Sequence, residues 1–142
     1  MDPESIVYGC IRDCPDGEPS ARRQRRAHNR QMLDQLPGLG GLPLLSRQMF
    51  SFCRFEGEGL YQTQVIHFGA SYRAVEYEWA TWLQQFETLL GRLYWSSAVV
   101  HLDTELRGFH TFRWESEQGF HQPGEGVLRM RCAWEHEGSL RG

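Results

Sequence analysis

The stretch Glu76–Trp114 reads EYEWATWLQQFETLLGRLYWSSAVVHLDTELRGFHTFRW and holds four of the five tryptophans of the chain. Its first half repeats apolar residues at steps of three and four, which is the spacing of one face of an α-helix. At Ser96-Ser97 the pattern changes to the alternation of a β-strand. The stretch therefore predicts a helix that leads directly into a hairpin. The apolar positions of this helix, whose tryptophans we expect in the core, are Trp79, Trp82, Leu83, Phe86, Leu89, Leu90, Leu93 and Tyr94.

The hairpin has a register that its own residues predict. Gly108 suits the left-handed position that ends a three-residue turn, Leu106–Gly108. A register shifted by one residue would reverse every side chain and break up the apolar layer of the two strands. The preferred turn gathers that layer from Val100, Leu102, Phe112 and Trp114, and it places Glu105 opposite Phe109, Asp103 opposite Thr111 and His101 opposite Arg113.

Shorter patterns on both sides of this stretch complete the fold prediction. The element order is β-α-β-β-α-β-β-β, and its first six members match a ferredoxin-like, split β-α-β pattern. We therefore expect one α+β domain over residues 1–142, with a mainly antiparallel sheet, two helices on one face and a C-terminal β meander. The outer elements are strands at Ser5–Arg12, Leu45–Phe55, Leu60–Ala70 and Val127–His136, with an EGEG hairpin turn, and an arginine-rich helix that Ser20 caps and that ends at Leu36.

Composition narrows the classes of function. A length of 142 residues suits one domain, and a net charge of −3 gives no general attraction to nucleic acid or membrane. The N-terminus, MDPESIVYGC, lacks the apolar core of an export signal, so we expect a cytoplasmic location. Neither a phosphate-binding glycine loop nor a nucleophile motif is present. We therefore expect no enzymatic activity and no cofactor.

Two stretches nonetheless suggest specific chemistry. His101, Asp103 and Glu105 alternate along one strand and offer ligands for a divalent metal, so a small metal-binding enzyme is one alternative. The preferred register places His110 on the other face, which favours a solvated, salt-bridged surface instead. The run Arg22–Arg30 offers a second alternative, an RNA-binding module, because clustered arginines can track phosphates. It lacks interleaved aromatic residues, which favours a solvated helix face.

Four segments, YGCIRD, LLSRQMFSF, TQVIHFGASYRAVEYEWATWLQQFETLLGRLYWSSAVVHLDTEL and HTFRWE, resemble small bacterial immunity proteins of polymorphic toxins of the type VI secretion or Rhs kind. The resemblance implies a cytoplasmic protein that binds one cognate toxin domain and blocks its active site. An acidic surface would complement the basic active site of many such toxins. We expect the partner-binding residues on the polar face of the hairpin: His101, Asp103, Glu105, Arg113, Glu115 and Glu117.

Overall fold

The computed structural model describes residues 4–13, 17–41, 43–52, 65–116, 119–125 and 129–135, the last of these by their backbone. These residues form two α-helices and six strands in the order β-α-β-β-α-β-β-β, with short 3-10 helices at Leu39–Gly41, Arg47–Met49 and Val75–Glu78. The principal elements are β1 (Glu4–Arg12), α1 (Pro19–Asp34), β2 (Phe50–Phe52), β3 (Val65–Arg73), α2 (Trp79–Leu90), β4 (Ser97–Thr104), β5 (Gly108–Glu115) and β6 (Arg129–Glu135).

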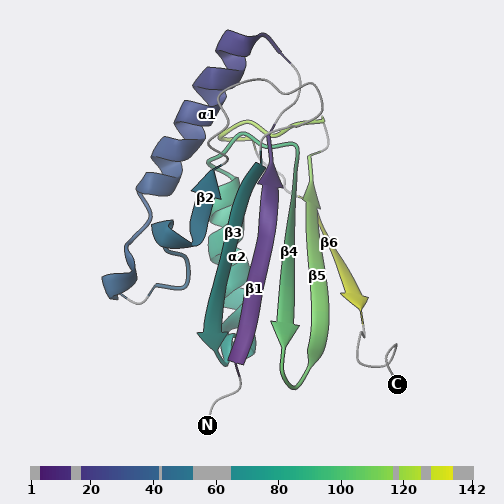
Figure 1. The fold of residues 1–142 in the computed structure, drawn as a ribbon. Helices are drawn as coiled ribbons and strands as arrows, with labels where there is room; N and C mark the ends of the chain where they lie inside the picture. The colour runs from purple at the N-terminus through teal and green to yellow at the C-terminus, as the bar shows by residue number, and fades with distance from the viewer. Residues whose placement is uncertain are drawn as a thin grey trace.

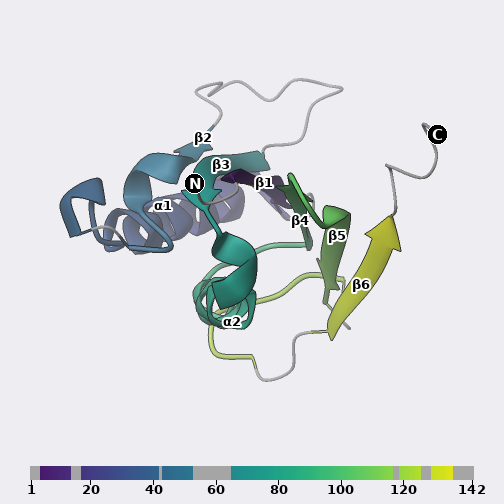
Figure 2. The same ribbon diagram turned by 90° about the horizontal axis from the view of Figure 1, so that it is seen from below.

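The strands form one sheet in the order β2-β3-β1-β4-β5-β6, and every neighbouring pair is antiparallel (Figure 1). β1 lies near the centre, between β3 and β4, and β3 separates β1 from β2 as a split β-α-β arrangement requires. β5 and β6 extend the sheet as a meander. Both helices lie on the same side of the sheet (Figure 2). The predicted α+β class, with an antiparallel sheet and two helices on one face, is confirmed.

The core forms where α2 meets the covered side of the sheet. Trp82 stacks on Phe86 with ring centroids 5.1 Å apart, and Phe86 in turn lies 5.1 Å from the ring of Trp114 on β5. Trp82 and Trp114 are fully buried, which confirms their predicted place in the core, and Trp95 is buried with them, whereas Trp79 is partly buried against the same cluster. Such aromatic pairs add about 0.5–1.5 kcal/mol each beyond the burial of their area. The periodic tryptophans therefore hold the helix on the sheet.

Tyr72 is the polar residue that joins the core to the loop before β2. Its hydroxyl accepts a hydrogen bond from Nε1 of Trp82, at 3.1 Å, and donates one to the carbonyl oxygen of Leu44. Burial raises the pKa of Tyr72 above its ordinary value, and the hydrogen bond from Trp82 opposes that rise. The phenol therefore stays neutral and keeps both hydrogen bonds at physiological pH.

The predicted hairpin register is wrong by two residues. Gly108 has the expected left-handed φ of 83°, but it pairs with Thr104, so the turn is Glu105–Arg107. The hydroxyl of Thr104 accepts a hydrogen bond from the Arg107 N–H at 2.8 Å and donates one to the Gly108 carbonyl at 3.0 Å. These bonds close the turn earlier than predicted. An even shift keeps each side chain on its predicted face, and Val100, Leu102, Phe112 and Trp114 are all buried.

Other element bounds also differ from the prediction. The strand expected from Leu45 is limited to β2 within the described residues, because the Met49 N–H bonds the Ser46 carbonyl and closes a 3-10 turn there. α1 begins at Pro19, without a side-chain cap from Ser20. β3 continues past Ala70 as far as Arg73, which pairs with Glu4. Residues 53–64, which include the predicted EGEG turn, and the two ends of the last predicted strand lie outside the described residues.

Candidate functional site

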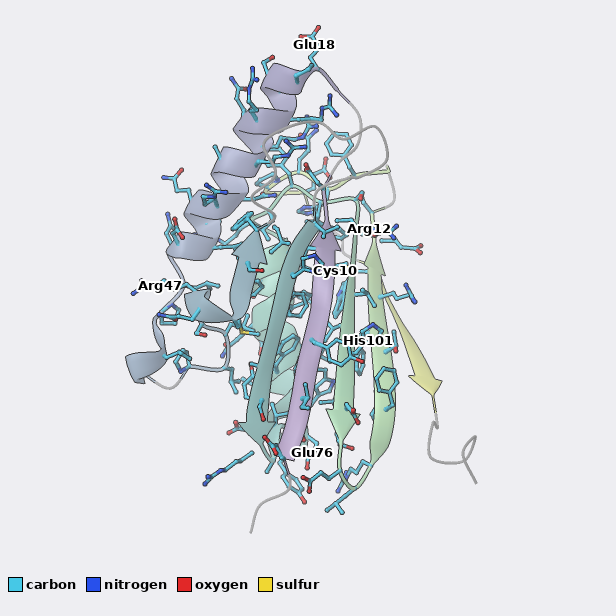
Figure 3. The ribbon with its side chains drawn as sticks, in the orientation of Figure 1. Cys10, Arg12, Glu18, Arg47, Glu76 and His101 are labelled. Carbon is cyan, nitrogen blue, oxygen red and sulfur yellow. The ribbon has the colours of Figure 1, made fainter. Side chains whose placement is uncertain are left out.

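The side of the sheet opposite the helices is the candidate site. No described helix covers it, and we call it the open face (Figure 3). It is built from alternate residues of the central strands, since successive side chains of a strand point to opposite sides. Its described side chains are Glu4, Ile6, Tyr8, Cys10 and Arg12 on β1; Val65, His67, Ser71 and Arg73, with Gly69 between them, on β3; Ser97, Val99, His101 and Asp103 on β4; and Phe109, Thr111, Arg113 and Glu115 on β5.

Aromatic rings gather at the centre of the open face. The His101 ring lies 4.9 Å from the ring of Tyr8 and 5.3 Å from that of Phe109. Nδ1 of His101 and Oγ1 of Thr111 share a hydrogen bond of 3.0 Å, and Thr111 is only 2% exposed although it lies on this face. Ile6 and Tyr8 remain 47% and 40% exposed. The protein thus presents an apolar surface whose rings already hold one another in place.

Charged side chains lie at the two ends of the open face. Each end carries carboxylates and guanidinium groups together, so the described part of this face has mixed charge rather than the acidic character expected from the sequence. A polar, charged rim around an apolar centre is the usual anatomy of a protein–protein interface. The residues at one end are Glu4, Arg73 and Asp103, and those toward the other are Arg12, Arg113 and Glu115.

The structure places four of the six predicted partner-binding residues on the open face. His101 is half-buried, whereas Asp103, Arg113 and Glu115 are exposed. Glu105 lies beyond the end of β4, in the turn, so it does not continue the row of His101 and Asp103 as predicted. Glu117 lies outside the described residues.

A metal-binding site at this hairpin would require the side chains of His101, Asp103 and Glu105 to point toward one ion. In the described part of the chain, no group of three or more histidine, cysteine, aspartate or glutamate side chains has the geometry to hold a metal ion. His101 instead shares its Nδ1 with Thr111. The geometry therefore favours a contact surface at this hairpin over a metal centre.

The arginines of α1 do not form one continuous stripe toward solvent. Nε of Arg26 lies 2.9 Å from a carboxylate oxygen of Asp13, and the guanidinium of Arg30 lies 5.0 Å from the ring centroid of Phe52. The side chain of Arg25 similarly lies 6.0 Å from the ring of Phe120. These contacts tie the helix to the body of the protein, which weakens the case for a phosphate-tracking helix.

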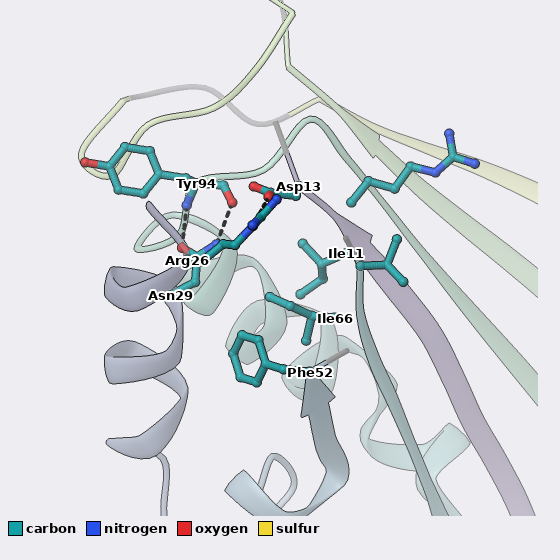
Figure 4. Close-up of a pocket in the computed structure, with 9 residues that line it drawn as sticks. Ile11, Asp13, Arg26, Asn29, Phe52, Ile66 and Tyr94 are labelled. Carbon is teal, nitrogen blue, oxygen red and sulfur yellow. Dashed lines mark hydrogen bonds and ion pairs between the residues drawn. The ribbon is translucent and has the colours of Figure 1, made fainter. Parts of the chain in front are cut away.

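A small cavity lies between α1 and the end of β1 (Figure 4). The buried Asn29 reaches across beside it, donating to the Tyr94 carbonyl and accepting from the Tyr94 N–H, both at 2.9 Å. With a volume of about 10 Å³, the cavity has room for one water molecule at most. We therefore interpret this region as a structural clamp that fixes α1 to the segment after α2.

A second cavity of about 490 Å³ opens between the segment after α1 and the outer side of α2. Its lining is largely leucine and proline, with Gln84, Gln85 and Thr88 beside them. Arg92 is its only ionisable lining residue, and that guanidinium donates to the Gln35 side chain at 2.6 Å. This lining offers no acid–base pair for catalysis.

Sequence reasoning missed the apolar centre of the open face. In β1, Ser5, Val7 and Ile11 are buried against the core, while Ile6 and Tyr8 point the other way. A strand that is apolar on both faces is a recognisable signal, because the central strands of a one-sided sheet normally alternate apolar and polar residues. That signal is present in SIVYGCIR.

Comparisons of this chain with protein-family models, with curated protein sequences and with solved structures find no match. Among the described residues, neither α-helix has the length and apolar character needed to cross a bilayer. The sequence pattern and the geometry of the open face therefore carry the functional argument.

Proposed function

We propose that this chain is a cytoplasmic immunity-type protein that binds a cognate toxin domain through its open face and blocks the toxin's active site. The observation that carries the proposal is the half-exposed pair Ile6 and Tyr8 beside the packed rings of His101 and Phe109. Contiguous apolar surface with a charged rim is typical of a docking site. The resemblance of the sequence to immunity proteins supplies the class of partner.

The open face has the dimensions of a protein interface. β1 and β3 each contain nine residues, and the strands that supply the described side chains of the open face, β3, β1, β4 and β5, are four neighbours in the sheet. At about 3.3 Å per residue and about 4.8 Å per strand, the face measures roughly 30 Å by 19 Å, or about 570 Å². A standard interface buries about 800 Å² on each partner. A toxin domain seated on this face would therefore cover most of it.

Packing among the rings also favours tight binding. Tyrosine is enriched among the few residues that dominate interface energy, partly because its ring loses little conformational freedom on binding. The ring of Tyr8 already lies against His101 and within 6.5 Å of Phe109. Association therefore has little side-chain ordering to overcome at the centre of the face.

The test uses the toxin domain encoded beside the gene for this chain. We expect Tyr8→Ser to weaken binding about 30-fold in isothermal titration, which corresponds to about 2 kcal/mol for an interface hot spot. Tyr77→Ser is the matched control, because Tyr77 is 67% exposed but lies in the 3-10 helix before α2. Wild-type chain and this control should protect cells that express the toxin. Undiminished binding and protection by Tyr8→Ser would contradict the proposed docking face.

A further inference from the structure

Gly69 lies in the middle of β3, directly opposite Tyr8 of β1. Glycine in a strand interior costs about 0.5–1 kcal/mol relative to alanine, so its presence in a central strand needs a reason. Three reasons are usual: a positive φ, a close contact within the chain, or the close approach of a ligand or another backbone.

The fold itself does not require a glycine at this position. Gly69 does not have a positive φ. A Cβ placed on it would lie 3.7 Å from the Cβ of Tyr8 and 3.7 Å from the Val7 carbonyl oxygen, which are ordinary contact distances. Gly9, on the covered side of β1, shows the contrast. A Cβ there would lie 2.0 Å from the Val99 carbonyl oxygen, so the sheet has no room for one.

The missing side chain leaves a gap on the open face, which we call the Gly69 gap. It is bounded by Tyr8 across the strand pair and by His67 and Ser71, the neighbours of Gly69 on the same face of β3. Gly69 is itself exposed, and the phenol ring of Tyr8 packs toward His101 on the other side. The backbone of β3 is therefore accessible at Gly69, next to the side chain of Tyr8.

Charge around the Gly69 gap indicates the chemistry of its occupant. Arg73 and Arg12 lie at the two ends of this β1–β3 half of the open face, on either side of the gap. Glu4, the described carboxylate on the same half, lies directly opposite Arg73, and its Oε1 accepts a hydrogen bond from the Ser71 hydroxyl, so this half carries two guanidinium groups against one carboxylate. This half therefore favours a partner that presents negative charge.

We infer that the Gly69 gap receives an apolar or aromatic side chain of the toxin domain, flanked on the toxin by carboxylates that face Arg73 and Arg12. The inference rests on the proposed function, because it names the contact that anchors the same docking face. The anchor stacks against the ring of Tyr8, and the absence of a side chain at Gly69 lets it approach the sheet closely.

The test fills the gap in two steps, with Gly69→Ala and Gly69→Val, and measures toxin binding by isothermal titration. We expect Gly69→Val to weaken binding at least tenfold and Gly69→Ala to weaken it less, with no fall in melting temperature for Gly69→Ala. Ser97→Val is the control, because it places the same valine side chain on the open face, at the far end of β4. Its affinity should stay within threefold of wild type.

The outcomes separate this inference from the proposed function. Wild-type affinity for both Gly69 variants would overturn the anchor while leaving toxin binding intact. Failure of the wild-type chain to bind the toxin would instead overturn the proposed function and the inference with it. A dimeric wild type that becomes monomeric in Gly69→Val would show that a second copy of the chain occupies the gap, which also contradicts the inference.

Discussion

Replacing glycine by alanine should have opposite effects on stability at Gly9 and at Gly69, which lie in the neighbouring central strands β1 and β3. Gly9→Ala inserts a Cβ 2.0 Å from the Val99 carbonyl oxygen and 2.8 Å from the ring of Phe68, so neighbouring strands must separate. Overpacking of this kind usually destabilises a protein by about 1–3 kcal/mol. Because the clash here is with the backbone of a paired strand, we expect a destabilisation of about 3 kcal/mol or more. Gly69→Ala creates only ordinary contacts and should stabilise the protein by about 0.5–1 kcal/mol.

Urea unfolding and thermal melting, each followed by tryptophan fluorescence, measure both effects, because the fully buried Trp82, Trp95 and Trp114 report on the core. At about 2–4 °C per kcal/mol, Gly9→Ala should lower the melting temperature by at least about 6 °C. Gly69→Ala should raise it by about 1–4 °C on the same scale. Loss of more than about 1 kcal/mol in Gly69→Ala would refute the reasoning, since the fold would then need that glycine for itself.

Two further predictions concern buried polar contacts. Asn29→Ala should lower the free energy of unfolding by about 2–4 kcal/mol, because two backbone groups of the half-buried Tyr94 lose their partner at about 1–2 kcal/mol each. A loss below about 1 kcal/mol in urea titrations would show that Asn29 does not clamp α1. Because the folded-state pKa of Tyr72 is raised, its contribution to stability should be full below about pH 10 and should fall as pH rises past that value. Tyr72→Phe should flatten this alkaline loss above about pH 10, and an unchanged slope would show that Tyr72 is not its source.

The sequence predicts on which face of the sheet a side chain lies better than it predicts how two neighbouring strands pair. Val100 and Leu102 alternate with polar residues, which fixes their side of the sheet, and the structure buries both. A register shifted by two residues keeps the same alternation of apolar and polar side chains. The apolar pattern therefore does not distinguish the predicted pairing of β4 and β5 from the observed one. The hydroxyl of Thr104 decides between them by bonding to Arg107 and Gly108. Such a local side-chain contact is not visible in an apolar pattern.

The candidate site was predictable only in part for a similar reason. His101 and Asp103 were identified because polar residues stand out on a hairpin, and both lie on the open face. Tyr8 was missed because an apolar strand does not show which of its faces the helices will cover. That choice depends on where α1 and α2 pack, which is a property of the whole sheet (Figure 2). The environment of Gly69 likewise exists only after β1 and β3 pair.

The most direct test of the proposed docking role for the open face is hydroxyl-radical footprinting of the chain with and without a candidate toxin domain encoded beside its gene. This measurement reports the solvent exposure of individual side chains. We predict strong protection of Ile6 and Tyr8 in the complex, with unchanged oxidation of Tyr77 and Leu39, which are 67% and 58% exposed away from that face. Protection of Tyr77 or Leu39 with continued oxidation of Tyr8 would place the toxin elsewhere and contradict the proposal.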